Sequence, residues 1–437
     1  MLTDPIAALA TPPGRSALAV VRLAGVGAFE IADRVVRNFQ VQPRLATLAT
    51  FLDARGEPID RGIYIVFPAP HSFSGDDTVE FSCHGGLTVP ARLLAALHAA
   101  GARPAAPGEF TRRAVLNGRM DLLQAEAVGD LIDATATAQG RAAVAQLDGN
   151  LSRRIQQLRG QLLELEALLS YDIDFPGEDD GPVAPERLTE ALAQAAAQTD
   201  RLLATAPAGE RLREGALVVI AGRPNAGKSS LFNALLGTER ALVTEIAGTT
   251  RDAIEAHLSF LDWPVRLVDT AGLRTTGDRI EAMGVEVSRR WLDAADLVLL
   301  CVEAGRELTP DERALEASHP VLLVRTKSDL VPEPEGVSAV TGEGLDQLKR
   351  RVAERLFGGQ LALADLEPGL TRERHRTALA AAQAELAAAR PFLGHDGDAT
   401  LASHHVRRAV LSLDELIGVV DIEEVLDRIF STFCVGK

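Results

Sequence analysis

The sequence predicts an α/β protein joined to an all-α part, with a mostly parallel sheet domain inserted between two helical segments. Three observations in the 437-residue chain indicate this. Strand and helix patterns alternate over residues 1–118, Ala- and Leu-rich helical spacing dominates residues 119–212 and 361–437, and continuous apolar runs lie in residues 213–360. The length suits about three domains of roughly 150 residues, each with its own core.

Composition and charge argue against several classes of protein. The chain is 46% apolar and 24% charged, with no apolar run near about 18 residues, which disfavours a disordered or membrane-spanning protein. Asp4 and the prolines near the N-terminus do not fit a signal peptide, so we expect a cytosolic protein without a membrane partner. The net charge of −16 argues against a broad basic surface, and we expect RNA contacts to be local or made largely by a partner.

The two flanking parts differ in periodicity. The first hundred residues predict strands at 16–25, 61–68 and 77–86 and helices at 27–39 and 89–100. Helical spacing of three and four then predicts long helices at 122–147, 153–169, 186–206, 375–390 and 406–430. The acidic, turn-rich segment 171–185 ends one helix, and the next is expected to start near Pro185.

Four apolar runs, at 216–222, 265–272, 296–303 and 321–329, predict a parallel sheet covered on both faces. The first is followed at once by Gly222–Ser229, which matches GxxxxGK[ST] between a strand and a helix. Such a loop curls backbone N–H groups around phosphates, Lys228 reaches the terminal phosphates, and the Ser229 hydroxyl ligates magnesium. The inserted domain is therefore expected to be a P-loop (Ras-like) nucleotide domain.

Two further elements at strand ends are typical of a GTPase, and the second of them favours GTP over ATP. Asp269, Thr270, Ala271 and Gly272 place a carboxylate near magnesium and an N–H near the γ-phosphate. Thr326, Lys327 and Asp329 offer an acceptor for two hydrogen bonds from guanine that adenine lacks, and Ser338, Ala339 and Val340 offer backbone contacts to the base.

Two positions depart from small signalling GTPases. Leu273 stands where a glutamine orients the attacking water, so another group must do this. Thr326 stands where asparagine is usual, and we expect a weakened contact between the base loop and the phosphate loop.

Specific motifs occur at residues 223–230 and 244–252 and in the tail 433–437, with further ones at 10–15, 83–86, 107–114 and 123–127. In these segments, and over essentially its whole length, the chain resembles the MnmE (TrmE) family of tRNA modification GTPases. The resemblance implies a tetrahydrofolate-binding, dimerising domain at 1–118, a helical domain at 119–212 and 361–437, and a G domain at 213–360. It also implies a flavoprotein partner, MnmG (GidA), which forms a heterotetramer with this chain and supplies the FAD and much of the surface that binds tRNA. The complex is expected to install an aminomethyl-type group on carbon 5 of the wobble uridine of certain tRNAs.

The resemblance and the motifs together assign site residues. The GTP-binding set is Asn225, Ala226, Gly227, Lys228, Ser229, Ser230, Thr244, Glu245, Ile246, Ala247, Gly248, Thr249, Thr250, Asp269, Thr270, Ala271, Gly272, Thr326, Lys327, Asp329, Ser338, Ala339 and Val340. The resemblance implies potassium on Asn225, Thr244, Ile246 and Thr249, and magnesium on Ser229 and Thr250. It also implies that Glu281 orients the attacking water. Without it, Asn225 could simply tolerate a tight turn, and Glu281 could lie on a solvated helix face.

The remaining assignments concern one-carbon chemistry. The resemblance maps a 5,10-methylene- or 5-formyl-tetrahydrofolate site onto Arg22, Glu80, Arg119 and Lys437, and implicates Cys434 in tRNA modification. Apart from the resemblance, Cys434 reads as an inert tail thiol, Cys83 and His84 as structural residues, and Cys301 as a core residue. A ribosome-assembly GTPase acting as an RNA-binding switch is the alternative function, weakened because no basic appendage follows the G domain.

Overall fold

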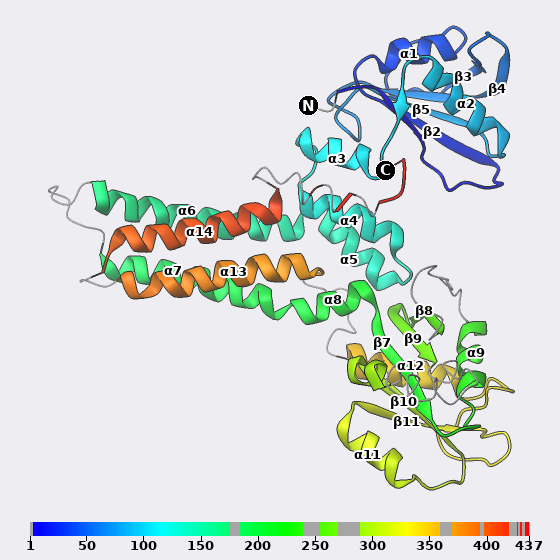
Figure 1. Cartoon of the computed structure of the whole chain (residues 1–437), viewed down its shortest axis with the longest axis vertical. Helices are drawn as coiled ribbons and strands as arrows, with labels where there is room; N and C mark the ends of the chain where they lie inside the picture. Colours follow the sequence, from blue (N-terminus) through cyan, green and yellow to red (C-terminus); the bar gives the residue numbers. More distant parts are fainter. Residues whose placement is uncertain are drawn as a thin grey trace, which may run out of the picture. The chain divides into compact units, whose positions relative to one another are not determined.

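Two compact units make up the chain, Met1–Gly129 with Asp414–Lys437 and Asp130–Leu413. The computed structural model describes residues 3–174, 184–238, 254–269, 289–358, 369–393, 397–418, 426, 429–430 and 433–436 (Figure 1). Within these ranges no helix is long and apolar enough to cross a membrane.

The first unit is built on a six-stranded sheet with the order β3-β4-β5-β2-β1-β6. Its strands are β1 (Ile6–Leu9), β2 (Leu18–Ala24), β3 (Thr47–Leu52), β4 (Pro58–Phe67), β5 (Thr78–His84) and β6 (Arg103–Pro104). Helices α1 (Ala28–Val35) and α2 (Thr88–Ala99) pack on one face, over alternate residues such as Phe51, Tyr64 and Phe81. The expected strands at 16–25, 61–68 and 77–86 are confirmed as β2, β4 and β5, whereas the helix expected at 27–39 ends at Val35.

Helix α3 (Glu109–Leu116) carries a buried arginine that ties three segments together. Arg113 is 1% exposed; it donates hydrogen bonds to the Asp4 carbonyl at 2.8 Å and to Glu109 Oε1 at 2.9 Å. Arg103 of β6 donates to Glu109 Oε2 at 2.8 Å. Burial alone would raise the pKa of Glu109, but the bonds from Arg103, the Ala106 amide and Arg113 outweigh it and lower the pKa.

This network predicts acid sensitivity of the first unit. Because the pKa of Glu109 is lowered on folding, its stabilisation is present above its ordinary pKa and is lost as the pH falls below about 4.5. Glu109→Gln should cost about 3 kcal/mol at pH 7, since two guanidinium groups lose a buried counter-charge. Calorimetry at pH 7 and pH 4 checks both points: acid should lower the unit's unfolding temperature less in Glu109→Gln than in the wild type. Equal acid shifts in the two proteins would show that Glu109 is not the titrating group.

The helices of the second unit come from both sides of the inserted sheet. They are the end of α4 (Leu122–Asp133), α5 (Thr137–Leu147), α6 (Asn150–Asp174), α7 (Pro185–Ala204), α8 (Ala206–Glu214), α13 (Glu373–Ala389), the short 3-10 turn Arg390–Phe392 and most of α14 (Ala399–Ile417). Helix α7 packs against α13, and Arg407 of α14 lies 3.1 Å from Glu166 of α6. The sheet is therefore inserted into one helical domain, as expected. The helix predicted over 122–147 is instead broken at 134–136, where Gln139 caps the start of α5.

The inserted sheet has the order β11-β10-β7-β9-β8. Its strands are β7 (Ala216–Gly222), β8 (Ile254–Phe260), β9 (Trp263–Asp269), β10 (Leu297–Glu303) and β11 (Val321–Thr326), with α9 (Lys228–Thr238), α11 (Pro310–Ser318) and α12 (Leu345–Phe357) beside them. Among the described strands of this sheet, all neighbours are parallel except β8 and β9, which are antiparallel. Strand β8 was not predicted from the sequence. The near-continuous burial of β7, β9 and β10 fits strands covered on both faces, and their carboxyl ends meet at one edge.

Candidate functional site

The loop between β7 and α9 has the backbone shape that the GxxxxGK[ST] pattern predicts. Asn225 and Gly227 adopt φ angles of 63° and 85°, which turn successive backbone N–H groups toward one concavity. Lys228, at the start of α9, is buried, and its Nζ donates to the Gly222 carbonyl at 2.9 Å and the Arg223 carbonyl at 2.7 Å. The ammonium group is thus held over the loop, where a bound phosphate would meet it.

Ser229 and Asp269 bring two hard oxygen donors together. The Ser229 hydroxyl, in the first turn of α9, donates to Asp269 Oδ2 at 2.9 Å, at the end of β9. Asp269 is 2% exposed at the end of β9. A hydroxyl beside a carboxylate suits Mg²⁺, which prefers oxygen ligands. The pair therefore fits the magnesium position expected from the sequence.

Thr326 corrects the expectation of a weakened contact between the two loops. Its hydroxyl donates to the Ala226 carbonyl at 2.7 Å, and the residue is only 4% exposed. A β-carbon added at Gly227 would lie 3.5 Å from the Thr326 β-carbon, so only about one methyl group would fit between the two loops. Threonine is shorter than the usual asparagine, but it still links the base loop to the phosphate loop because the backbones of the two loops approach closely.

A cavity of about 250 Å³ opens beside this link. Its lining includes Gly227, Ser230, Leu231, Thr326, Lys327, Asp329, Leu330, Val337, Ala339 and Val340. Ser338 is fully buried, and its hydroxyl accepts from the Val340 and Thr341 amides at 3.2 Å, which orders the turn carrying Ala339. Apolar walls with the Asp329 carboxylate fit a planar heterocycle that offers hydrogen-bond donors.

Two residues that sequence analysis missed brace the phosphate loop from the other side. Arg223 Nε donates to Glu312 Oε1 at 2.9 Å. Glu312 also caps α11 with Thr309, and the bonds from Thr309 and Arg223 outweigh burial and lower its pKa. The Thr309–Glu312 capping box is visible in the sequence, whereas its pairing with Arg223 is a tertiary contact.

Several expected site residues lie outside the part of the chain that the structure describes. They are Thr244, Glu245, Ile246, Ala247, Gly248, Thr249, Thr250, Thr270, Ala271, Gly272, Glu281 and Lys437.

A second cluster lies in the first unit, where Arg22 and Glu80 are cross-strand partners on β2 and β5. Arg22 Nε donates to Glu80 Oε1 at 2.9 Å, and its guanidinium carbon lies 5.3 Å and 5.4 Å from the ring centres of Phe73 and Phe110. Arg22 Nη1 donates to the Gly436 carbonyl at 3.4 Å. The expected residue Arg119 is exposed and lies beside the Gly75 turn.

The C-terminal tail is attached to the same unit by backbone contacts. Val435 bridges Pro107, and the Cys434 carbonyl accepts from the Gly108 amide at 3.4 Å. Gly436 has φ 100°, and a β-carbon there would lie 2.2 Å from the Leu9 carbonyl oxygen. The tail therefore brings the exposed Cys434 thiol to the unit that holds Arg22 and Glu80.

The other two cysteines are buried and poorly suited to reaction. Burial raises the pKa of Cys83 to about 11 and that of Cys301 to about 12, so neither thiolate forms near neutral pH. Cys301 lies in the core of the inserted domain, as expected.

Comparison with known proteins places this architecture in one family. Residues 122–434 match the MnmE helical domain, and residues 5–119 match the GTP-binding protein TrmE N-terminus. The tRNA modification GTPase MnmE of Moorella thermoacetica is 42% identical over all of both chains, and that of Aquifex aeolicus is 40% identical over all of both. The solved G domain of the T. maritima FeoB iron transporter is 28% identical, with a TM-score of 0.26 over 32% of this chain and 98% of that one. The chain belongs to the MnmE (TrmE) family and is a GTPase of tRNA modification.

Proposed function

We propose that this GTPase is potassium-dependent and acts with a flavoprotein of the MnmG (GidA) type in aminomethyl-type modification of carbon 5 of the wobble uridine. The one-carbon donor in this proposal is a 5,10-methylene- or 5-formyl-tetrahydrofolate. The observation that supports its GTPase part is the convergence of the phosphate loop, the Ser229–Asp269 pair and the Asp329 cavity at one edge of the sheet.

Each described residue has a role that its position supports. Lys228 would contact the terminal phosphates, which compete with the two carbonyls that now accept its hydrogen bonds. Ser229 would ligate magnesium, with Asp269 orienting a water on the ion. Asp329 would accept two hydrogen bonds from guanine in the cavity of about 250 Å³.

Asn225 is the described residue that would hold potassium, with oxygens of Thr244, Ile246 and Thr249. It is exposed in the loop at φ 63°, so its side-chain oxygen is accessible. When bound, potassium supplies charge that offsets the negative charge developing between the β- and γ-phosphates. With Leu273 unable to orient water, Glu281 is the proposed orienting residue.

Replacing potassium by sodium should lower GTP turnover at least tenfold, because the smaller ion does not complete the same ligand set. Asn225→Gly should remove the potassium stimulation and keep GTP affinity, since glycine tolerates the positive φ angle. Phosphate release in matched chloride buffers measures turnover, and a fluorescent GTP analogue measures affinity. Equal turnover in sodium and potassium would refute the assignment.

Arg22 and Glu80 are the proposed core of the folate site. A carboxylate suits the hydrogen-bond donors of a pterin edge, and a guanidinium suits a carboxylate tail. Phe73 and Phe110 flank the guanidinium, and the tail carrying Cys434 and, beyond it, Lys437 is attached to the same unit.

Cys434→Ser should eliminate tRNA modification and leave GTP turnover unchanged, because the thiol is in the first unit and the nucleotide loops are in the second. Mass spectrometry of the wobble nucleoside, after reaction with the flavoprotein partner, measures modification. Cys83→Ser is the matched control, since that thiol is buried and its pKa is about 11. Modification retained in Cys434→Ser would discard a chemical role for this cysteine.

Self-association through the first unit is also proposed. The sheet face opposite α1 and α2 carries Leu48 and its cross-strand partner Ile63, which are 59% and 40% exposed, together with Leu18 at 61%. Exposed apolar side chains on one sheet face support burial against a second copy. The cytoplasmic location and the heterotetramer with MnmG stay predictions.

A further inference from the structure

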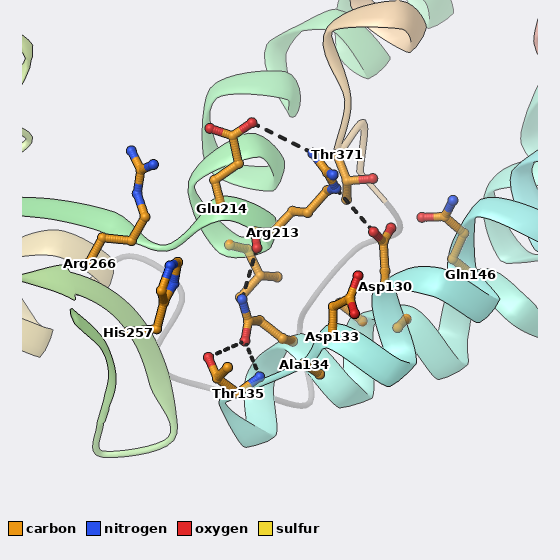
Figure 2. Close-up of a pocket in the computed structure, with 14 residues that line it drawn as sticks. Asp130, Asp133, Ala134, Thr135, Gln146, Arg213, Glu214, His257, Arg266 and Thr371 are labelled. Atoms are coloured by element: carbon orange, nitrogen blue, oxygen red, sulfur yellow. Dashed lines mark hydrogen bonds and ion pairs between the residues drawn. The ribbon is translucent and has the colours of Figure 1, made fainter. Parts of the chain in front are cut away.

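A cavity of about 310 Å³ lies in the second unit, away from the nucleotide loops (Figure 2). It is bounded by the end of α4, by α5, by the end of α8 and by strands β8 and β9. None of its lining residues lines the base cavity described above. The nucleotide, folate and tail sites do not account for it.

Hydrogen bonds hold the walls of this cavity in place, two between α5 and the β8–β9 hairpin and one between α5 and α8. The Thr137 hydroxyl donates to Asp262 Oδ1 at 2.6 Å, and the Ala138 amide donates to the Asp262 carbonyl at 3.0 Å. Ala138 is fully buried in the core of the inserted domain. Gln139 donates to the Arg213 carbonyl at 2.8 Å. The cavity is therefore preformed between braced elements.

One carboxylate in the lining is already neutralised. Asp130 accepts from Arg213 Nε at 3.0 Å and from Arg372 at 2.6 Å, so two guanidinium groups share its charge. Asp133 and Glu214 also line the cavity, but both are exposed and water screens their charge.

The opposite wall presents positive charge and an unused donor. Arg266 and His257 are cross-strand partners on β9 and β8, so both side chains leave the same face of the hairpin, as Figure 2 shows. Among the residues that the structure describes, Arg266 Nε is buried without a hydrogen-bond partner, while Nη1 of the same guanidinium lies 3.7 Å from Glu255 Oε1. Thr371, from a different segment, also lines the cavity, and its buried hydroxyl has no hydrogen-bond partner within the described part of the chain. A buried polar atom without a partner costs free energy that a bound acceptor would recover.

We infer that this cavity binds a small organic carboxylate with an apolar body. The carboxylate would accept from Arg266 Nε beside His257, and charge-assisted bonds of this kind are the stronger ones. Leu212, Ala142 and Ala143 offer apolar surface to the body of the ligand. A cation would leave the Arg266 donor unpaired and would face a guanidinium, so the wall selects an anion. This site is independent of the proposed function.

Benzoate is the test probe, with benzamide as its uncharged match. Calorimetric titration of the full-length protein should detect benzoate binding at least tenfold tighter than benzamide binding. Arg266→Gln should weaken benzoate binding at least tenfold, and Thr371→Val should leave this preference for the charged probe intact. Arg187→Gln, which removes an exposed arginine of α7 that does not line the cavity, is the matched control and should bind benzoate as the wild type does.

Affinity for GDP, measured in each variant, separates loss of the site from loss of the fold, because Arg266 lies outside the nucleotide loops. Equal binding of benzoate and benzamide, no binding of benzoate up to its solubility, or unchanged benzoate affinity in Arg266→Gln would each overturn the inference.

Discussion

The hydrogen bond from the Thr326 hydroxyl to the Ala226 carbonyl holds the two halves of the nucleotide site together. It joins residues 100 apart in the sequence: Thr326 ends β11, and Ala226 lies in the loop after β7, which β10 separates from β11 in the sheet. It is buried, so it works in a low dielectric, and losing it would leave a carbonyl without its partner. The spacing between the phosphate loop and the base cavity depends on this contact, and the Arg223–Glu312 pair braces the same loop from α11.

The β8–β9 hairpin connects this site to the helical domain. One end of the hairpin carries Asp269, which binds Ser229, and the other end carries Asp262, which anchors the start of α5. Leu261 and Asp262 both adopt positive φ angles at the turn, which suits a tight two-residue connection. The cavity lined by Arg266 and His257 adjoins this anchor. The β8–β9 hairpin therefore contributes to the Ser229–Asp269 pair, to the contact with the helical domain and to the inferred carboxylate site.

Much of this arrangement could be predicted because its signals are local. The GxxxxGK[ST] pattern and the apolar runs place the phosphate loop and four strands, and they do so from short-range rules. Strand β8 was missed because only alternate residues are buried in an edge strand that lacks a continuous apolar run. Long-range contacts were not predictable: the Thr326 link, the Arg223–Glu312 pair and the attachment of Gly436 to Leu9 each depend on how closely two distant backbones approach. The domain boundaries and the roles of Glu281 and the loop oxygens stay predictions.

The most direct measurement of the central claim is nucleotide affinity in variants of Thr326. Thr326→Val keeps the shape of the side chain and removes the donor, whereas Thr326→Ser keeps the donor and removes a methyl group. If the hydroxyl holds the loops together, Thr326→Val should weaken GDP and GTP binding about tenfold, or about 1.4 kcal/mol, and Thr326→Ser should bind nearly as the wild type does. Wild-type affinity in Thr326→Val would contradict the account, because the two loops would then keep their spacing without this bond.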